Sequence, residues 1–135
     1  MTVSTGRFMV GLYIRGDKLD PKHITTELGV NPTDSQFKGQ KHITKTNKQV
    51  VAQIGMWSLI SHITTDNLSD HIADISHHIK QKGSTILNLK AVEEAYIDIA
   101  VFEESKSCVF FEIDKESMSL LADMALPVHF TVYSG

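Results

Sequence analysis

The chain contains seven histidines, the side chains best suited to bind a metal ion or to carry protons near neutral pH. His71, Asp74 and His78 fall at positions i, i+3 and i+7 of an expected helix. On a helix His71 and His78 lie almost two turns apart, roughly 10 Å along the axis, so one ion could not easily reach both. The spacing also differs from the i, i+4 histidine pair of zinc-protease helices. We interpret them as histidines at the solvated boundary of a helix, and no metal site is predicted.

The other reactive side chains form no recognisable catalytic group. Cys108 has no local motif around it, and a nucleophile needs a neighbouring base and an orienting group. It is therefore interpreted as a buried structural thiol. Catalysis would require distant residues such as His62, His129 and Asp98 to converge, which sequence spacing cannot show.

Neither the adjacent carboxylates nor the glycines of the chain indicate a catalytic or nucleotide-binding site. The pairs Glu93-Glu94 and Glu103-Glu104 are neighbours in sequence, so on a strand or helix they point apart and make no acid–base pair. Neither a dinucleotide-binding nor a P-loop glycine motif occurs. The sequence therefore predicts a protein that is not an enzyme and that uses no cofactor.

Composition indicates a single domain over residues 1–135. Hydrophobic residues make up 41% of the chain and charged residues 21%, which suits one globular core. A single cysteine excludes an intrachain disulfide and favours a reducing compartment. The first residues lack a secretory signal pattern, and no apolar stretch approaches the ~20 residues that a membrane span needs. We expect a cytoplasmic protein without a membrane partner.

Apolar periodicity predicts alternating strands and helices. Strands are expected over 8–15, over 50–63 with a break near Gly55, over 96–103, over 108–113 and over 128–132. Helices are expected from Asp20-Pro21 to Leu28, over 66–82, and from Asp114 to 126. Residues 33–49 are expected to be irregular, and 84–94 fit either a short strand or a turn of helix. The fold class is therefore α+β, a largely antiparallel mixed sheet with helices packed on one face, in the order β-α-β-α-β-β-α-β.

Two of these helices show a clear apolar stripe. Leu68, Ile72, Ile75 and Ile79 share one face of the second helix. In the third helix, Met118, Leu121 and Ala122 are expected to face the core.

The second face of the sheet is unusually apolar. Strand parity puts these residues opposite the core: Met9, Tyr13, Met56, Ile60, Tyr96, Ala100, Phe102, Phe110 and Tyr133. Such a face must be covered. The 33–49 segment could fold over it, or a ligand, a second copy of the chain or a partner protein could cover it. The candidate contact residues are Tyr13, Trp57, Tyr96, Phe102 and Phe110.

Charge is distributed unevenly along the chain. Residues 1–90 carry 11 Lys and Arg against 7 Asp and Glu, whereas residues 91–135 carry 2 against 9. The acidic part, with Glu103 and Glu104 as candidate contacts, suits a basic protein partner, although it could equally be a solvated face that aids solubility. It disfavours nucleic acid, and the lysine-rich 38–48 segment has no arginine and only Phe37 beside it for stacking.

Several local motifs together resemble a bacterial family known as the domain of unknown function DUF4279. The matching residues are Leu19-Asp20-Pro21, Ile24-Thr25, Leu28-Gly29-Val30-Asn31-Pro32-Thr33, Lys38-Gly39, Gly55-Met56-Trp57-Ser58-Leu59 and Leu68-Ser69-Asp70-His71. The family name implies no activity, cofactor or catalytic residue. Small domains of similar appearance occur as cytosolic antidotes beside bacterial toxins.

Three functions remain open from the sequence. The first is a non-enzymatic binding module, most concretely an immunity protein that binds and neutralises a basic toxin domain. The second is a small-ligand-binding or regulatory domain with a pocket between the apolar face and the 33–49 segment, lined by Tyr13, Trp57 and Tyr96. The third is a homodimer that buries the same face.

Overall fold

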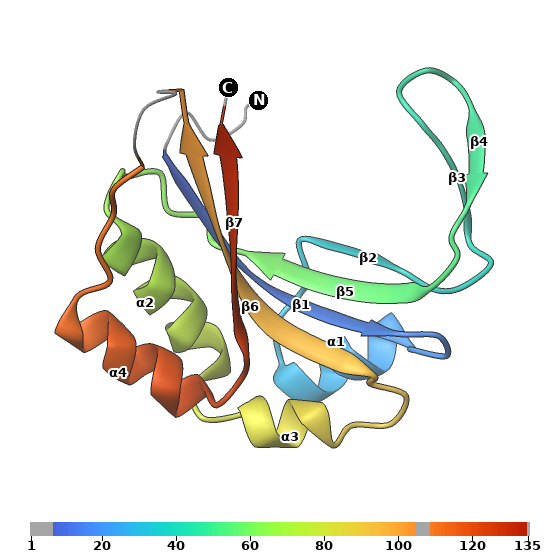
Figure 1. Ribbon diagram of the computed structural model, residues 1–135. Helices are drawn as coiled ribbons and strands as arrows, with labels where there is room; N and C mark the ends of the chain where they lie inside the picture. The colour runs from blue at the N-terminus through green and yellow to red at the C-terminus, as the bar shows by residue number, and fades with distance from the viewer. Residues whose placement is uncertain (1–6, 105–108, 135) are drawn as a thin grey trace.

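A computed structural model describes residues 7–104 and 109–134 of the chain. One sheet carries five strands, and a separate two-stranded hairpin follows its second strand (Figure 1). The strands are β1 (Phe8–Gly16), β2 (Asp34–Gln36), β3 (Lys41–Ile43), β4 (Gln49–Val51), β5 (Gly55–Ile60), β6 (Glu94–Glu103) and β7 (Val128–Ser134). The helices are α1 (Pro21–Leu28), α2 (Leu68–Ile79), α3 (Gly83–Leu87) and α4 (Lys115–Met124).

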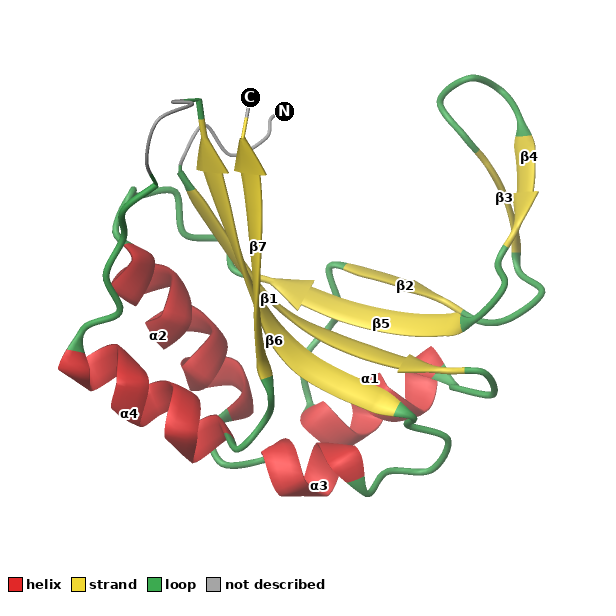
Figure 2. Ribbon diagram, viewed as in Figure 1, coloured by secondary structure: helices red, strands yellow, loops and turns green. Residues whose placement is uncertain are grey.

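The five-stranded sheet has the order β2-β5-β1-β6-β7. All neighbours are antiparallel except β6 and β7, which run parallel and are joined through α4. The four helices lie on one side of this sheet (Figure 2). The expected class, an α+β domain with a mostly antiparallel sheet and helices on one face, is confirmed.

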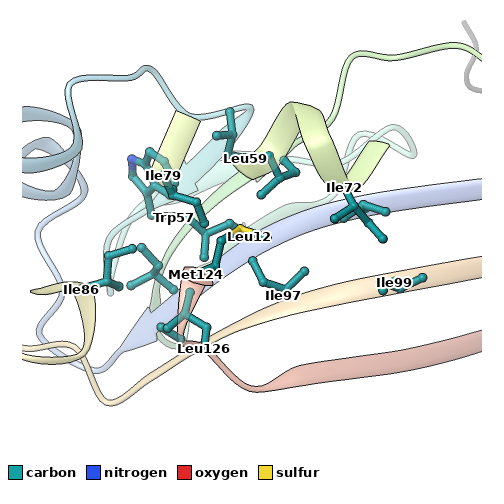
Figure 3. Packing of buried hydrophobic residues seen from close by; sticks show 14 of the residues in the cluster. Leu12, Trp57, Leu59, Ile72, Ile79, Ile86, Ile97, Ile99, Met124 and Leu126 are labelled. Atoms are coloured by element: carbon teal, nitrogen blue, oxygen red, sulfur yellow. The ribbon is translucent and has the colours of Figure 1, made fainter. Parts of the chain in front are cut away.

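The core fills the space between the sheet and the helices. Alternate residues of β1, β5 and β6 point into it, because successive side chains of a strand face opposite sides. Leu12, Trp57 and Ile97 are fully buried there against Ile72 of α2 and Met124 of α4 (Figure 3). The strands β1, β5 and β6 and the four helices therefore share one hydrophobic cluster.

Local signals set the ends of the first helix as expected. The Asp20 side chain accepts a hydrogen bond from the Lys22 backbone N–H (3.1 Å), and Pro21 begins the helix. Gly29 ends it with φ of 70°, a left-handed conformation that glycine adopts without steric cost.

Helix α2 differs from its expected form in three ways. It ends at Ile79 rather than near Lys82. It begins at Leu68, because the Asn67 side chain, not Asp66, accepts the Ser69 N–H. His71 is buried, and its Nε2–H donates to the Thr65 carbonyl at 2.8 Å, so its interpretation as a solvated boundary histidine was wrong. Its apolar neighbours along the stripe are buried as predicted.

Helix α4 begins at the expected cap but buries a different face. Asp114 accepts the Ser117 backbone N–H at 2.8 Å, and the hydrogen bonds from Ser117 lower the pKa of the Asp114 carboxyl. Ser117 and Met124 are buried, whereas Met118 and Ala122 are exposed, so the predicted apolar face was rotated.

Residues 109–113 form no strand, which corrects the expected hairpin at 108–113. Both edges of β6 are already occupied, by β1 on one side and β7 on the other. Val109, Phe111 and Ile113 pack instead against the core on the helical side. Cys108 and the expected turn at Ser105-Lys106 lie outside the described residues.

The segment expected to be irregular, 33–49, contains the strands β2 and β3, and the strand expected over 50–63 with a break near Gly55 forms as β4 and β5. β2 extends the sheet beside β5, and β3 pairs with β4 as a hairpin that stands away from the sheet (Figure 1). The ambiguous residues after Gly83 form the short helix α3.

Replacement of Gly83 by alanine tests the contact between α3 and α4. An ideal Cβ at this position would lie 1.8 Å from the Met124 carbonyl oxygen, which is backbone and cannot rotate away. We expect Gly83→Ala to lower the free energy of unfolding by about 1–3 kcal/mol, as overpacking does. Urea denaturation measures this, with Ser84→Ala at the exposed neighbouring position as the control. Equal midpoints for the two variants would contradict the contact.

Candidate protein-binding face of the sheet

The face of the sheet opposite the four helices is the candidate site. Strand parity brings to it alternate residues of four adjacent strands, and the register of the pairs fixes their neighbours. Its members are Met9, Gly11 and Tyr13 of β1, Met56, Ser58 and Ile60 of β5, Tyr96, Asp98, Ala100 and Phe102 of β6, and His129, Thr131 and Tyr133 of β7.

Stacked rings cross three strands of this face. The rings of Tyr13 and Tyr96 lie 5.6 Å apart at 19°, and those of Tyr96 and His129 lie 4.0 Å apart at 15°. Nearer the other end, Phe102 stacks on Tyr133 at 5.0 Å and 9°. Each stacked pair couples neighbouring strands through the faces of its rings.

The chain closes part of this face with its own side chains rather than with the 33–49 segment. An ideal Cβ at Gly11 would lie 2.5 Å from Ile60 Cδ1 and 3.0 Å from Tyr13 Cε2. Because Gly11 has no side chain, Ile60 and Tyr13 can lie across β1, and Ala100 is buried. The hairpin of β3 and β4 stands away from the sheet, which argues against this segment as the cover among the alternatives left open by the sequence (Figure 1).

The β6–β7 end of the face stays open. Phe102 is 38% exposed and Tyr133 is 54% exposed although they stack on each other. An exposed aromatic pair on a sheet is unusual unless something binds to it, since large apolar surface exposed to water is unfavourable.

A carboxylate lies in the middle of the face. Asp98 accepts a hydrogen bond from the Thr131 hydroxyl at 2.9 Å. Burial and, second, the negative charge of Asp98 raise the pKa of the Tyr13 phenol to about 12. Tyr13 is therefore a neutral donor at all physiological pH values.

The charges at this face are mostly negative. Arg15 pairs with Glu94 at 3.4 Å at one end of the face, and Asp98 lies nearer its middle, opposite His129. At the end of β6, Glu103 pairs with Arg7 at 3.2 Å, and Glu104 is exposed. The acidic surface is thus smaller than the sequence suggests, because structural contacts use part of it.

Two of the predicted contact residues are not on this face. Trp57 is fully buried on the opposite side of the sheet, where its Nε1–H donates to Thr25 Oγ1 at 3.0 Å. Phe110 is 76% exposed, but it belongs to the extended segment before α4 and accepts a hydrogen bond from Arg7 through its carbonyl. Of the predicted set, the structure brings Tyr13, Tyr96 and Phe102 together and places Glu103 and Glu104 at their end.

Sequence reasoning left His129, Thr131 and Gly11 out of the predicted site. The alternation in residues 128–132 would have placed His129 and Thr131 on the second face once the strand was paired with β6. Nothing in the sequence alone reveals which strand pairs with β7.

The potential metal ligands among the described residues are dispersed. No three His, Cys, Asp or Glu side chains among them could hold one metal ion. A cleft of about 580 Å³ lies elsewhere, near the beginning of α2, and is lined by residues that include Arg7, Asp66, Asn67, Phe110 and Asp114. Asp66, Asn67 and Asp114 there accept backbone N–H groups, and Arg7 binds the Phe110 carbonyl. In the described part of the chain no helix is both long and apolar enough to cross a membrane.

The fold and the face together define a small α+β domain with one helix-covered and one open side. A family model described as domain of unknown function DUF4279 matches residues 6–135, and the chain belongs to this family. No curated protein and no solved structure matches this chain.

The raised pKa of Tyr13 can be measured by alkaline titration of tyrosinate absorbance. The absorbance change from the Tyr13 phenol should appear near pH 12, and it should be absent from the Tyr13→Phe variant. In Asp98→Asn the pKa of Tyr13 should fall toward that of a free tyrosine without reaching it, because burial is the larger cause of the shift. Since the raised pKa means that the folded state holds this proton more tightly, stability should fall as the pH rises from about 10 through 12.

Circular dichroism recorded along the same titration ensures that the folded protein is observed. A Tyr13→Phe titration identical to that of the wild type would contradict the placement of this phenol.

Proposed function

We propose that this chain is a non-enzymatic protein-binding module whose open sheet face receives its partner. The observation that carries the proposal is the exposed Phe102–Tyr133 stack, on the same face as the rings of Tyr13, Tyr96 and His129 and nearer its other end. Aromatic anchors of this kind contribute most of the binding free energy at protein interfaces. Their rings are already held by stacking, so little side-chain entropy is lost on binding.

The charges support a basic partner. Asp98 lies within the face and Glu104 is exposed at its end, while Arg15 is paired with Glu94. Carboxylates within and beside a binding face accelerate association with a cationic surface and disfavour an anionic one. A basic toxin domain that this chain neutralises in the cytoplasm, as an immunity protein, is the partner that we propose.

The small-ligand alternative loses the features that supported it. It required a pocket between the face and the 33–49 segment with Trp57 in its lining. Trp57 is in the core, and the β3–β4 hairpin stands away from the sheet.

Co-expression with a basic toxin encoded beside this chain tests the proposal. The wild type should restore growth and should co-purify with the toxin as a complex that weakens with added salt. Phe102→Lys should abolish both effects, because it replaces an anchor by a charge that repels the partner. Phe37→Lys is the matched control, since Phe37 is a 55% exposed phenylalanine that is not part of the open face, and it should behave as the wild type.

Absence of any complex at low salt would overturn the proposal. Equal loss in the two lysine variants would show that the open face is not the binding surface.

A further inference from the structure

The edge strand β7 lacks the features that normally protect a sheet edge. It is the last strand in the order β2-β5-β1-β6-β7, and within the described residues no strand pairs with its outer side. Its sequence, VHFTVYS, contains no proline, lysine or acidic residue. Natural edge strands are usually short, charged or interrupted, because an unpaired apolar edge binds other strands.

The backbone direction of β7 follows from one hydrogen bond. The Ile97 N–H donates to the Pro127 carbonyl at 2.9 Å. In a parallel ladder, alternate residues turn both backbone groups toward the neighbour. His129, Thr131 and Tyr133 therefore point their backbone groups toward β6, whereas those of Val128, Phe130 and Val132 point outward.

A second copy of β7 satisfies these outward groups in one symmetric register. When two β7 strands run antiparallel about a two-fold axis at Thr131, Phe130 faces Val132 of the other copy and His129 faces Tyr133. The outward-pointing residues then form the hydrogen-bonded pairs, as an antiparallel ladder requires. The full strand is paired without an overhang, and no charged side chain faces another.

The side chains in this register are complementary as well. Phe130 is 51% exposed and Val132 is 49% exposed, and both lie on the helical side of the sheet at its edge. Aromatic and β-branched residues are favourable cross-strand pairs. On the open face, Tyr133 would extend the ladder of rings that ends at His129 of the other copy.

We propose that β7 pairs with β7 of a second copy of this chain, so that two five-stranded sheets form one continuous sheet about a two-fold axis. This inference goes beyond the proposed function and does not depend on it, because the pairing uses the outward backbone groups of β7. The two proposals share one residue, Tyr133, which lies on the open face beside Phe102.

The expected affinity is modest. Burying the exposed halves of Phe130, Val132 and Tyr133 would remove on the order of 250 Å² of apolar surface per copy. Even when the buried backbone surface is added, the area buried per copy is below the ~800 Å² per partner of a standard interface. The dimer should therefore dissociate in the micromolar range.

Light scattering and sedimentation of the full chain from about 1 μM to about 500 μM test the pairing. The measured mass should rise with concentration from 15.1 kDa toward twice that value. Val132→Pro should hold the protein monomeric, because it removes an outward N–H while the ladder to β6 keeps its bonds. Val132→Lys should do the same by placing two charges opposite apolar side chains. Val51→Lys, at a 42% exposed valine on the hairpin, is the matched control and should still dimerise.

A cysteine at the two-fold axis tests the register directly. In Thr131→Cys, made in a Cys108→Ser background, the two thiols face each other in a non-hydrogen-bonded pair whose Cα atoms are about 4.5 Å apart. Mild oxidation should yield a covalent dimer, whereas Thr46→Cys on the hairpin should not.

A constant monomer mass across the whole concentration range would overturn the proposal. A dimer that persists in both Val132 variants would overturn it too, because its interface would lie elsewhere. Circular dichroism of every variant distinguishes loss of pairing from loss of folding.

Discussion

The packing of helices against one side of β1 and β6 is the constraint on which the rest of the structure depends. These adjacent strands are flanked by other strands on both edges, and their inward side chains are buried under the helices, with α2 against β1 and α3 against β6. All four helices are used on this side. The opposite side must therefore be closed by side chains of the sheet itself or remain exposed.

Both outcomes occur on that opposite side. Around Gly11, the missing side chain lets Ile60 and Tyr13 lie across the strand, and this part is closed. Toward the end of β6, Phe102 and Tyr133 stack but stay exposed. A sheet covered by helices on one side only therefore has, on its other side, one region closed by its own side chains and one open aromatic region. Binding of a partner to the open region would bury the most apolar surface.

Much of the fold followed from periodicity and capping, and the errors have physical causes. Asp20, Gly29 and Asp114 are short-range signals, so the ends they mark were predictable. The strand expected over 108–113 alternates apolar residues correctly, yet β6 has no free edge for it once β7 pairs there. For the candidate site, Tyr13, Tyr96 and Phe102 were found by strand parity, whereas Phe110 was assigned to the face through the strand that does not form.

The sequence by itself determined the fold class, both ends of α1, the start of α4 and the apolar character of both sheet faces, because these depend on residue type and on neighbours a few positions away. Only the tertiary structure decided which strand pairs with which, and hence that His129 stacks on Tyr96 and that Trp57 belongs to the core. Strand order is set by contacts between residues far apart in the chain, whose free energies depend on the whole packing arrangement. For the same reason, the apolar second face was visible in the sequence, but its uncovered end at Phe102 and Tyr133 was not.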